Sequence, residues 1–247
     1  MSCKDILFPL PMLPSIPDNL DSLDSRKALP FLMAFMKNTL IRGLNNVHQV
    51  APLLNSNNPR TIFFLKYITS LCKLLRTHLE GDRLFFSLAL PGGKALRDIV
   101  SIDCHPDLTF VHKALDQVES KLDAWTKNPA SYCSLTLRQG IEFAPTMIVK
   151  MQVQLNLLSF DYISSLISDK DLRPMIQANM EWFASHSDIT FLLPFVISHH
   201  DTSTSPHWPT ITEQGAAALP SLIKEHAGCW EFAPIDPLTK QTNPMVF

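Results

Sequence analysis

The sequence predicts an all-α protein, an antiparallel bundle of four long helices with extra helices and a proline-rich C-terminal tail. Apolar residues recur at helical spacing through several long windows, which is the pattern of amphipathic helices. The chain has 247 residues with seven Gly and three Tyr, too few for the turns and aromatic strands of a β protein. Four long helices joined by modest loops favour an antiparallel bundle.

The first two helices form the predicted centre of the bundle. The first is expected over residues 26–54, with Asp24 or Ser25 as its cap. The second is expected over residues 59–88, and Pro91 with the two glycines after it ends it. The apolar stripe of the first helix consists of Leu29, Leu32, Met36, Leu40, Leu44 and Val47.

Three further helices are expected along the chain. They cover residues 107–125, 135–166 and 169–184, and a short helix is expected over 94–100. Pro145 falls inside the expected helix 135–166, which we expect it to kink.

The chain is expected to form a single domain over residues 1–247. Residues 1–25 read as an extended arm, 26–190 as the bundle and 191–247 as the tail. The tail carries seven prolines and one expected helix, about 213–226. It has too little periodic apolar sequence for a core of its own, so we expect it to wrap the bundle.

Composition and charge restrict the classes of molecule that the protein is expected to bind and the compartment in which it is expected to lie. A formal net charge of −2 and the lack of a Lys/Arg run argue against nucleic acid. No apolar run reaches 18 residues, so no transmembrane helix is expected. The five cysteines are scattered and form no Cys-x-x-Cys, which indicates free thiols in a reducing compartment. We therefore expect a soluble cytoplasmic protein; a homodimer is left open.

The most informative local pattern is His78 followed by Asp82 within an apolar helix. Residues four apart lie on the same face of a helix. An imidazole and a carboxyl facing the inside of a bundle are costly unless they are paired or bound to metal.

Several segments together resemble motifs of fungal hemerythrin-like proteins. The matching segments are 37–45, 78–86, 143–149, 193–201 and 230–234. The resemblance implies a hemerythrin-like four-helix bundle whose relatives bind two irons with about five His and two carboxylates.

The ligand positions that the resemblance implies are mostly lost. His78, Asp82 and His112 remain. The other positions fall on Lys37, Leu108, Met151 and either Leu155 or Asn156. We therefore expect no metal and no cofactor. Lys37 either pairs with Asp82 or reaches solvent at the flank of the bundle. The two histidines are then core side chains, and a single metal on the three retained residues is the alternative.

A second polar cluster, His199, His200, Asp201 and His207, suggests zinc. Its spacing matches no common zinc pattern, so turn capping is the preferred interpretation.

These residues lead to a functional hypothesis. We expect a metal-independent enzyme of fungal specialised metabolism that binds an apolar small molecule in the bundle and promotes a cycloaddition of the Diels–Alder type, a cyclisation or a dehydration. The alternatives are a non-catalytic binder and a residual iron protein. The expected catalytic residues are Lys37, His78, His112 and Asp82, and the expected substrate-binding residues are Arg42, Phe86, Met151, Gln154 and Trp182.

Overall fold

The computed structural model confirms the all-α class. It describes residues 8–15, 20–90, 93–200 and 211–244, and within these ranges it contains helices and two isolated bridges but no strand. The helices are α1 (Ser25–Val50), α2 (Thr61–Ser87), α3 (Thr109–Lys127), α4 (Ser134–Gly140), α5 (Ala144–Leu157), α6 (Phe160–Leu166), α7 (Asp169–His186), α8 (Ile189–His199) and α9 (Glu213–Glu225).

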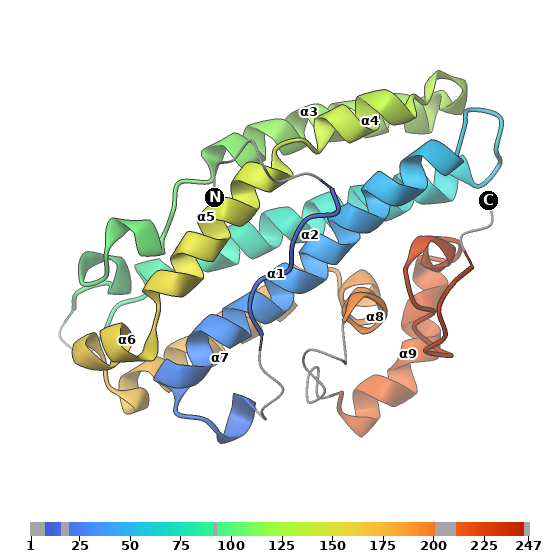
Figure 1. The fold of residues 1–247 in the computed structure, drawn as a ribbon. Coiled ribbons are helices and arrows are strands. Elements are labelled where there is room, and N and C mark those ends of the chain that lie inside the picture. Colours follow the sequence, from blue (N-terminus) through green and yellow to red (C-terminus); the bar gives the residue numbers. More distant parts are fainter. Residues whose placement is uncertain (1–7, 16–19, 91–92, 201–210, 245–247) are drawn as a thin grey trace.

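The two long helices α1 and α2 run antiparallel through the middle of the molecule (Figure 1). Asp24 caps α1 as expected, because its side chain accepts a hydrogen bond from the Arg26 backbone amide. Leu40 and Ile41 of α1 are fully buried, as is Phe64 of α2. Burial of these apolar faces provides most of the helical stability, since isolated helices of ordinary sequence are marginal in water.

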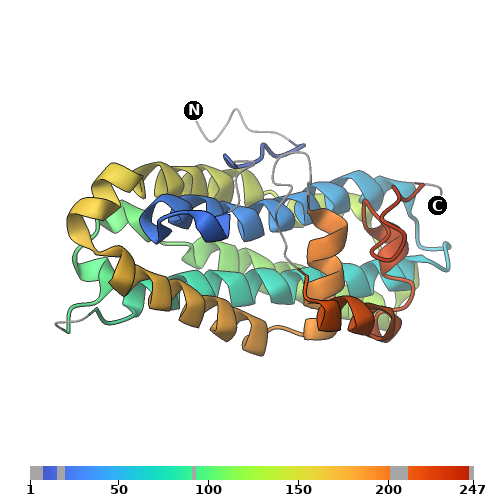
Figure 2. The same ribbon diagram turned by 90° about the horizontal axis from the view of Figure 1, so that it is seen from below.

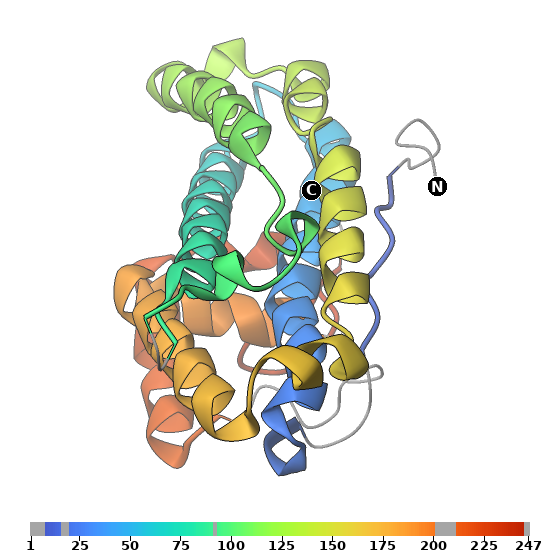
Figure 3. The ribbon, with the colours of Figure 1, turned by 90° about the vertical axis from the view of Figure 1, so that its left-hand side faces the viewer.

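The other helices lie on two sides of this central pair. Viewed along the pair, α3 and α5 lie on one side, and α7 with α8 on the other (Figure 3). α7 packs on both α1 and α2, so its apolar face closes that side of the bundle.

The single kinked helix expected over residues 135–166 is instead three helices, α4, α5 and α6. Pro145 does not kink a helix but occupies the first turn of α5, where a missing N–H costs nothing. The chain leaves helical geometry at Ile141 and Leu158, the residues that end α4 and α5. The expected short helix at 94–100 is a 3-10 turn, Leu96–Asp98.

A helix that the sequence did not predict, α8, crosses the α1–α2 pair at a steep angle (Figure 2). Pro194 lies inside it, and Asp188 caps it. Phe191 and Phe195 are buried in the main hydrophobic core. α8 therefore spans the expected boundary between bundle and tail, and its first part belongs to the core rather than to a wrapping segment.

Polar contacts hold the N-terminal arm, and packing on α8 holds α9. In the N-terminal arm, the backbone amides of Leu10 and Leu13 donate to the side chains of Asn45 and Asn38 at 2.6 and 2.7 Å. α9 forms where the sequence predicts it and packs on α8.

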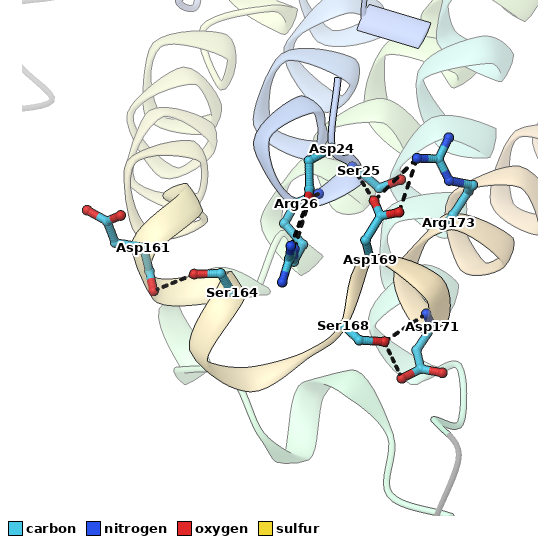
Figure 4. A network of polar contacts seen from close by, with 9 residues as sticks. All are labelled: Asp24, Ser25, Arg26, Asp161, Ser164, Ser168, Asp169, Asp171 and Arg173. Carbon is cyan, nitrogen blue, oxygen red and sulfur yellow. Dashed lines mark hydrogen bonds and ion pairs between the residues drawn. The ribbon is translucent and has the colours of Figure 1, made fainter. Parts of the chain in front are cut away.

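A polar network ties the start of α1 to the start of α7 (Figure 4). Asp169 accepts a hydrogen bond from the Ser25 backbone amide at 2.6 Å and pairs with Arg173 at 3.2 Å. Ser168 caps α7 by accepting from the Asp171 amide. The network fixes α7 against α1 at one end of the space between α1, α2, α7 and α8.

Candidate functional site

A cavity of about 260 Å³ lies between α1, α2, α7 and α8. Its lining is mainly apolar and includes three polar side chains. The lining residues are Leu29, Leu32, Met33, Phe35, Met36, His78, Gly81, Asp82, Phe85, Ile176, Asn179, Met180, Phe183, Ile189, Leu192, Leu193 and Val196. An apolar hollow with a few polar groups is the usual composition of a small-molecule site.

A buried ion pair joins α1 to α2 beside this cavity. The Lys37 side chain is 0% exposed and its Nζ lies 2.5 Å from Oδ2 of Asp82, whose side chain is 15% exposed. Burial alone would raise the pKa of Asp82, but the nearby Lys37 ammonium outweighs it and holds that pKa below its usual range. Lys37 therefore pairs with Asp82 and does not reach solvent.

His78 is the residue of the site with a buried nitrogen that lacks a hydrogen bond to the described residues. Its side chain is 8% exposed, and its Nε2 has no hydrogen-bond partner among the described residues. Phe183 of α7 meets the imidazole edge to face, with 5.9 Å between ring centres. Burial lowers the pKa of His78 to about 4; Asp82 opposes this shift and Lys37 adds to it. His78 is therefore neutral at pH 7.

The helical spacing explains why His78 and Asp82 lie together, one turn apart on α2. Even so, 3.8 Å separates His78 Nε2 from Asp82 Oδ1, which is too long for a hydrogen bond. Gly81, between them in sequence, lets α7 approach closely, because a Cβ there would lie 3.2 Å from the Trp182 ring. Asn179 of α7 donates to the Gly81 carbonyl at 2.7 Å and fixes that approach.

Three of the other expected site residues line a different hollow. His112, Phe86 and Gln154 border a second cavity of about 290 Å³, on the side of α2 that faces α3 and α5. Gln154 donates to the Cys104 carbonyl at 2.9 Å. Of the four expected catalytic residues, Asp82 alone borders both of these cavities.

The remaining expected binding residues line neither of these cavities. Met151 is buried in the main core. Arg42 is half-buried and donates to the His199 carbonyl at 3.4 Å. Trp182 is half-buried and stacks on His186, with 4.3 Å between ring centres. These three residues therefore do not line the α1–α2–α7–α8 cavity, and their role in binding stays a prediction.

The lining residues that the sequence did not predict include several from α7 and α8. Ile176, Phe183, Leu192 and Val196 line the cavity. The apolar periodicity of 169–184 was the available signal for Ile176 and Phe183. The prolines after Leu193 concealed the helix that carries Leu192 and Val196.

Of the second polar cluster, His199 belongs to a hydrogen-bonded network in the core. The Tyr67 hydroxyl lies 2.6 Å from His199 Nε2, and His199 Nδ1 lies 2.9 Å from the Phe195 carbonyl. Since that carbonyl can only accept, Nδ1 donates to it and Nε2 accepts from the tyrosine. Burial lowers the pKa of His199 to about 3, so it stays neutral. Asp201 and His207 lie outside the described residues.

The iron site of the resembled family does not fit these residues. The Lys37 ammonium lies against Asp82, which is the place where a cation bound by that carboxylate would be. In the described part of the chain, no three His, Cys, Asp or Glu side chains gather closely enough to hold a metal ion.

Fold and site together define an all-α protein with an apolar cavity between α1, α2, α7 and α8 and a buried Lys–Asp pair beside it. No family model, curated protein or solved structure matches the chain. Among the described residues, no helix has both the length and the apolar character that a membrane crossing requires.

Proposed function

We propose that the chain is a metal-independent enzyme that binds an apolar small molecule in the α1–α2–α7–α8 cavity and promotes its cyclisation, cycloaddition or dehydration. The observation that carries this proposal is His78, a residue that lines the apolar cavity and whose buried Nε2 has no hydrogen-bond partner among the described residues. A buried polar atom without a partner costs free energy, and such atoms gather at functional sites.

The cavity supplies the first part of the proposed mechanism. A flexible apolar molecule held between α1, α7 and α8 loses conformational freedom before it reacts, and orientation of this kind lowers barriers by up to about 7–11 kcal/mol in the best cases. The polar network between Asp169, Ser25 and Arg173 keeps α7 in place, so the walls are set before binding.

His78 supplies the second part. A neutral imidazole with a pKa of about 4 accepts a proton or a hydrogen bond at pH 7 but is a scarce proton donor. Lys37 is held by Asp82, so its role is to keep that carboxylate ionised. These protonation states favour a base-initiated cyclisation or a cycloaddition by confinement over an acid-assisted dehydration.

We further propose that the fold is a hemerythrin-like four-helix bundle formed by α1, α2, α3 and α5, and that the reaction belongs to fungal specialised metabolism. Lys37 then compensates Asp82 with the positive charge that iron supplies in that family. The motifs in the sequence support this origin.

A non-catalytic binder is the second candidate function. It is favoured by the second hollow, which separates His112 from His78 and so leaves the cavity with a single titratable group free to act.

Kemp elimination separates the two candidates without knowledge of the natural substrate. In 5-nitrobenzisoxazole, a base removes the ring C–H proton while the N–O bond breaks, and the cyanophenolate product absorbs visible light. We expect the full-length protein to accelerate this reaction, with a rate that rises through pH 4 and is then constant to pH 7.

The matched variants decide the outcome. His78→Phe should abolish the acceleration, while His186→Phe, which changes an exposed histidine outside the cavity, should retain it. Equal rates for wild type and His78→Phe would contradict the enzyme proposal and leave the binder.

A further inference from the structure

The second cavity, of about 290 Å³, has a polar lining, in contrast to the α1–α2–α7–α8 cavity. It lies between α2, the segment 97–107, the start of α3 and α5. Nine of its thirteen lining residues have polar side chains, against three of seventeen in the first cavity. An apolar ligand would cover these polar groups without satisfying them, which is costly, so the lining favours a ligand that forms hydrogen bonds.

Gln154 of α5 provides a hydrogen-bond acceptor on the buried side of this cavity. The residue is 3% exposed, and its Nε2 donates to the Cys104 carbonyl at 2.9 Å. Because a carbonyl can only accept, this bond fixes which end of the amide is the nitrogen. Oε1 therefore points away from Cys104, and it accepts no hydrogen bond from the described residues.

The Oε1 atom of Gln154 is accessible to a ligand. Among the described residues that are not exposed, the side-chain atoms that lack a partner and are sealed from solvent are His78 Nε2 and Ser187 Oγ. Gln154 Oε1 lacks a partner too but is not sealed, so it keeps accessible surface. Since Gln154 borders the second cavity, a molecule held there reaches this oxygen.

The apolar part of the lining lies next to this acceptor. Leu79 and Phe86 of α2 are buried and border the cavity. The His105 ring lies beside Phe86, with 5.8 Å between ring centres. These side chains offer a surface on which the apolar body of a ligand can pack.

The charged groups of the lining do not favour an ion of either sign. They are two arginines and two aspartates, namely Arg83, Arg97, Asp82 and Asp107. Asp82 is already paired with Lys37, and Arg83 is paired with Glu80 at 2.5 Å. An ionised ligand would lose hydration on entry and would meet as many like charges as opposite ones.

We infer that the second cavity is a binding site for a small uncharged molecule with an apolar body and an N–H or O–H donor, and that this donor bonds to Oε1 of Gln154. The site is separate from the α1–α2–α7–α8 cavity, and the inference does not depend on the function proposed for that cavity. Because Asp82 borders both cavities, the two ligands would lie on different sides of α2 at the same level of the helix.

Calorimetric titration of the full-length protein with four single-ring compounds at pH 8 tests the inference. Benzamide is neutral and has an N–H donor, whereas methyl benzoate is neutral and can only accept. Benzoate is an anion, and benzamidine is a cation with N–H donors. We expect benzamide to bind about fivefold more tightly than each of the other three, because it alone donates to Gln154 without carrying a charge into the cavity.

A matched pair of variants on α5 identifies the acceptor. Gln154→Leu should abolish the preference for benzamide over methyl benzoate. Gln152→Leu, which changes a glutamine that does not line the cavity and bonds to Asn156 at the surface, should keep the preference. Circular dichroism of both variants shows whether the helices are intact.

NMR of the wild-type protein with ¹⁵N-labelled histidine locates the site without any substitution. Benzamide should shift the ring resonances of His105 and His112, which line the cavity, and leave those of His48, which lies outside it, unchanged. Shifts confined to other histidines would place benzamide elsewhere and overturn the inference, even if Gln154→Leu fails to fold.

The remaining outcomes are equally decisive. Equal affinity for benzamide and methyl benzoate would overturn the donor, and tightest binding of benzoate or benzamidine would overturn the claim about charge. If none of the four compounds binds, the second cavity is not a ligand site. The proposed function fails on a different result, equal Kemp elimination rates for wild type and His78→Phe, so the two failures are distinguishable.

Discussion

Lys37 and Asp82 form an ion pair inside the bundle, with 2.5 Å between Nζ and Oδ2 and a lysine side chain that is fully buried. Transfer of two charges from water to a protein interior is costly, and removal of one partner leaves the other charge uncompensated. The pair therefore makes the junction of α1 and α2 sensitive to single substitutions at either residue.

Substitution of Lys37 alone should destabilise the protein strongly. We expect Lys37→Met to lower the free energy of unfolding by about 3–5 kcal/mol, because it leaves the Asp82 carboxylate buried without its cation. Urea denaturation at pH 7 measures the loss. The double variant Lys37→Met/Asp82→Leu should recover most of it, and a double variant as unstable as the single one would contradict the role given to the charge.

Removal of the imidazole at position 78 should not lower the free energy of unfolding, in contrast to the substitution of Lys37. We expect His78→Phe to keep or raise the free energy of unfolding, by about 1 kcal/mol, because it removes an unsatisfied buried polar atom and the adjacent cavity has room for the larger ring. Urea denaturation at pH 7 measures the change. A loss above about 2 kcal/mol would show that Nε2 has a partner in solution.

Acid should destabilise the protein through two histidines. Folding lowers the pKa of His78 to about 4 and that of His199 to about 3, from 6.5. The unfolded chain therefore binds protons that the folded protein does not, and stability falls as pH drops below 6.5.

Each of these histidines should account for about 2 kcal/mol between pH 7 and pH 5. Urea denaturation at the two pH values should show a smaller loss for His78→Phe than for wild type. His186→Phe serves as the control and should retain the full loss. Identical pH dependence in wild type and His78→Phe would mean that His78 titrates normally.

The Tyr67–His199 hydrogen bond should stabilise the position of α8. We expect Tyr67→Phe to cost about 1–3 kcal/mol, because it leaves the buried Nε2 of His199 without a donor. Tyr132→Phe is the matched control, since the Tyr132 hydroxyl donates to the Ala51 carbonyl at 3.0 Å but does not contact α8. Thermal unfolding compares the two, and a larger loss for the control would contradict the network.

Filling the cavity should block binding without unfolding the protein. Val196→Phe adds bulk from α8 into the α1–α2–α7–α8 cavity. We expect at least a tenfold loss of the affinity for naphthalene, an apolar ring compound that serves as the probe, by calorimetry, since the volume the probe needs is taken. Unchanged affinity would place the probe outside this cavity.

The sequence predicted the parts of the fold that depend on local pattern. The helical periodicity of 26–54 and 59–88 corresponds to α1 and α2, and Asp24 caps α1 as expected. The prediction from the sequence was wrong at two prolines, because proline can end or bend a helix, start one, or lie inside one. Pro145 starts a helix rather than bending one, and Pro194 lies inside α8 although prolines usually end helices.

In the candidate site, too, the sequence predicted the features that depend on local pattern. His78 and Asp82 share a helix face by spacing alone, and the pairing of Lys37 with Asp82 was one of the two alternatives that the sequence left open. The division into two cavities was not predictable, because it depends on the steep crossing of α8 and on the close approach of α7 at Gly81. Neither feature leaves a periodic signal in the sequence.

Nitrogen NMR of the full-length protein with ¹⁵N-labelled histidine tests the central claim most directly, because it follows Nε2 of His78 itself. We predict that His78 stays neutral at pH 7, titrates with a pKa of about 4, and shows shifted ring resonances when naphthalene fills the cavity that His78 lines. A pKa near 6.5, with ring resonances that naphthalene leaves unchanged, would contradict the account.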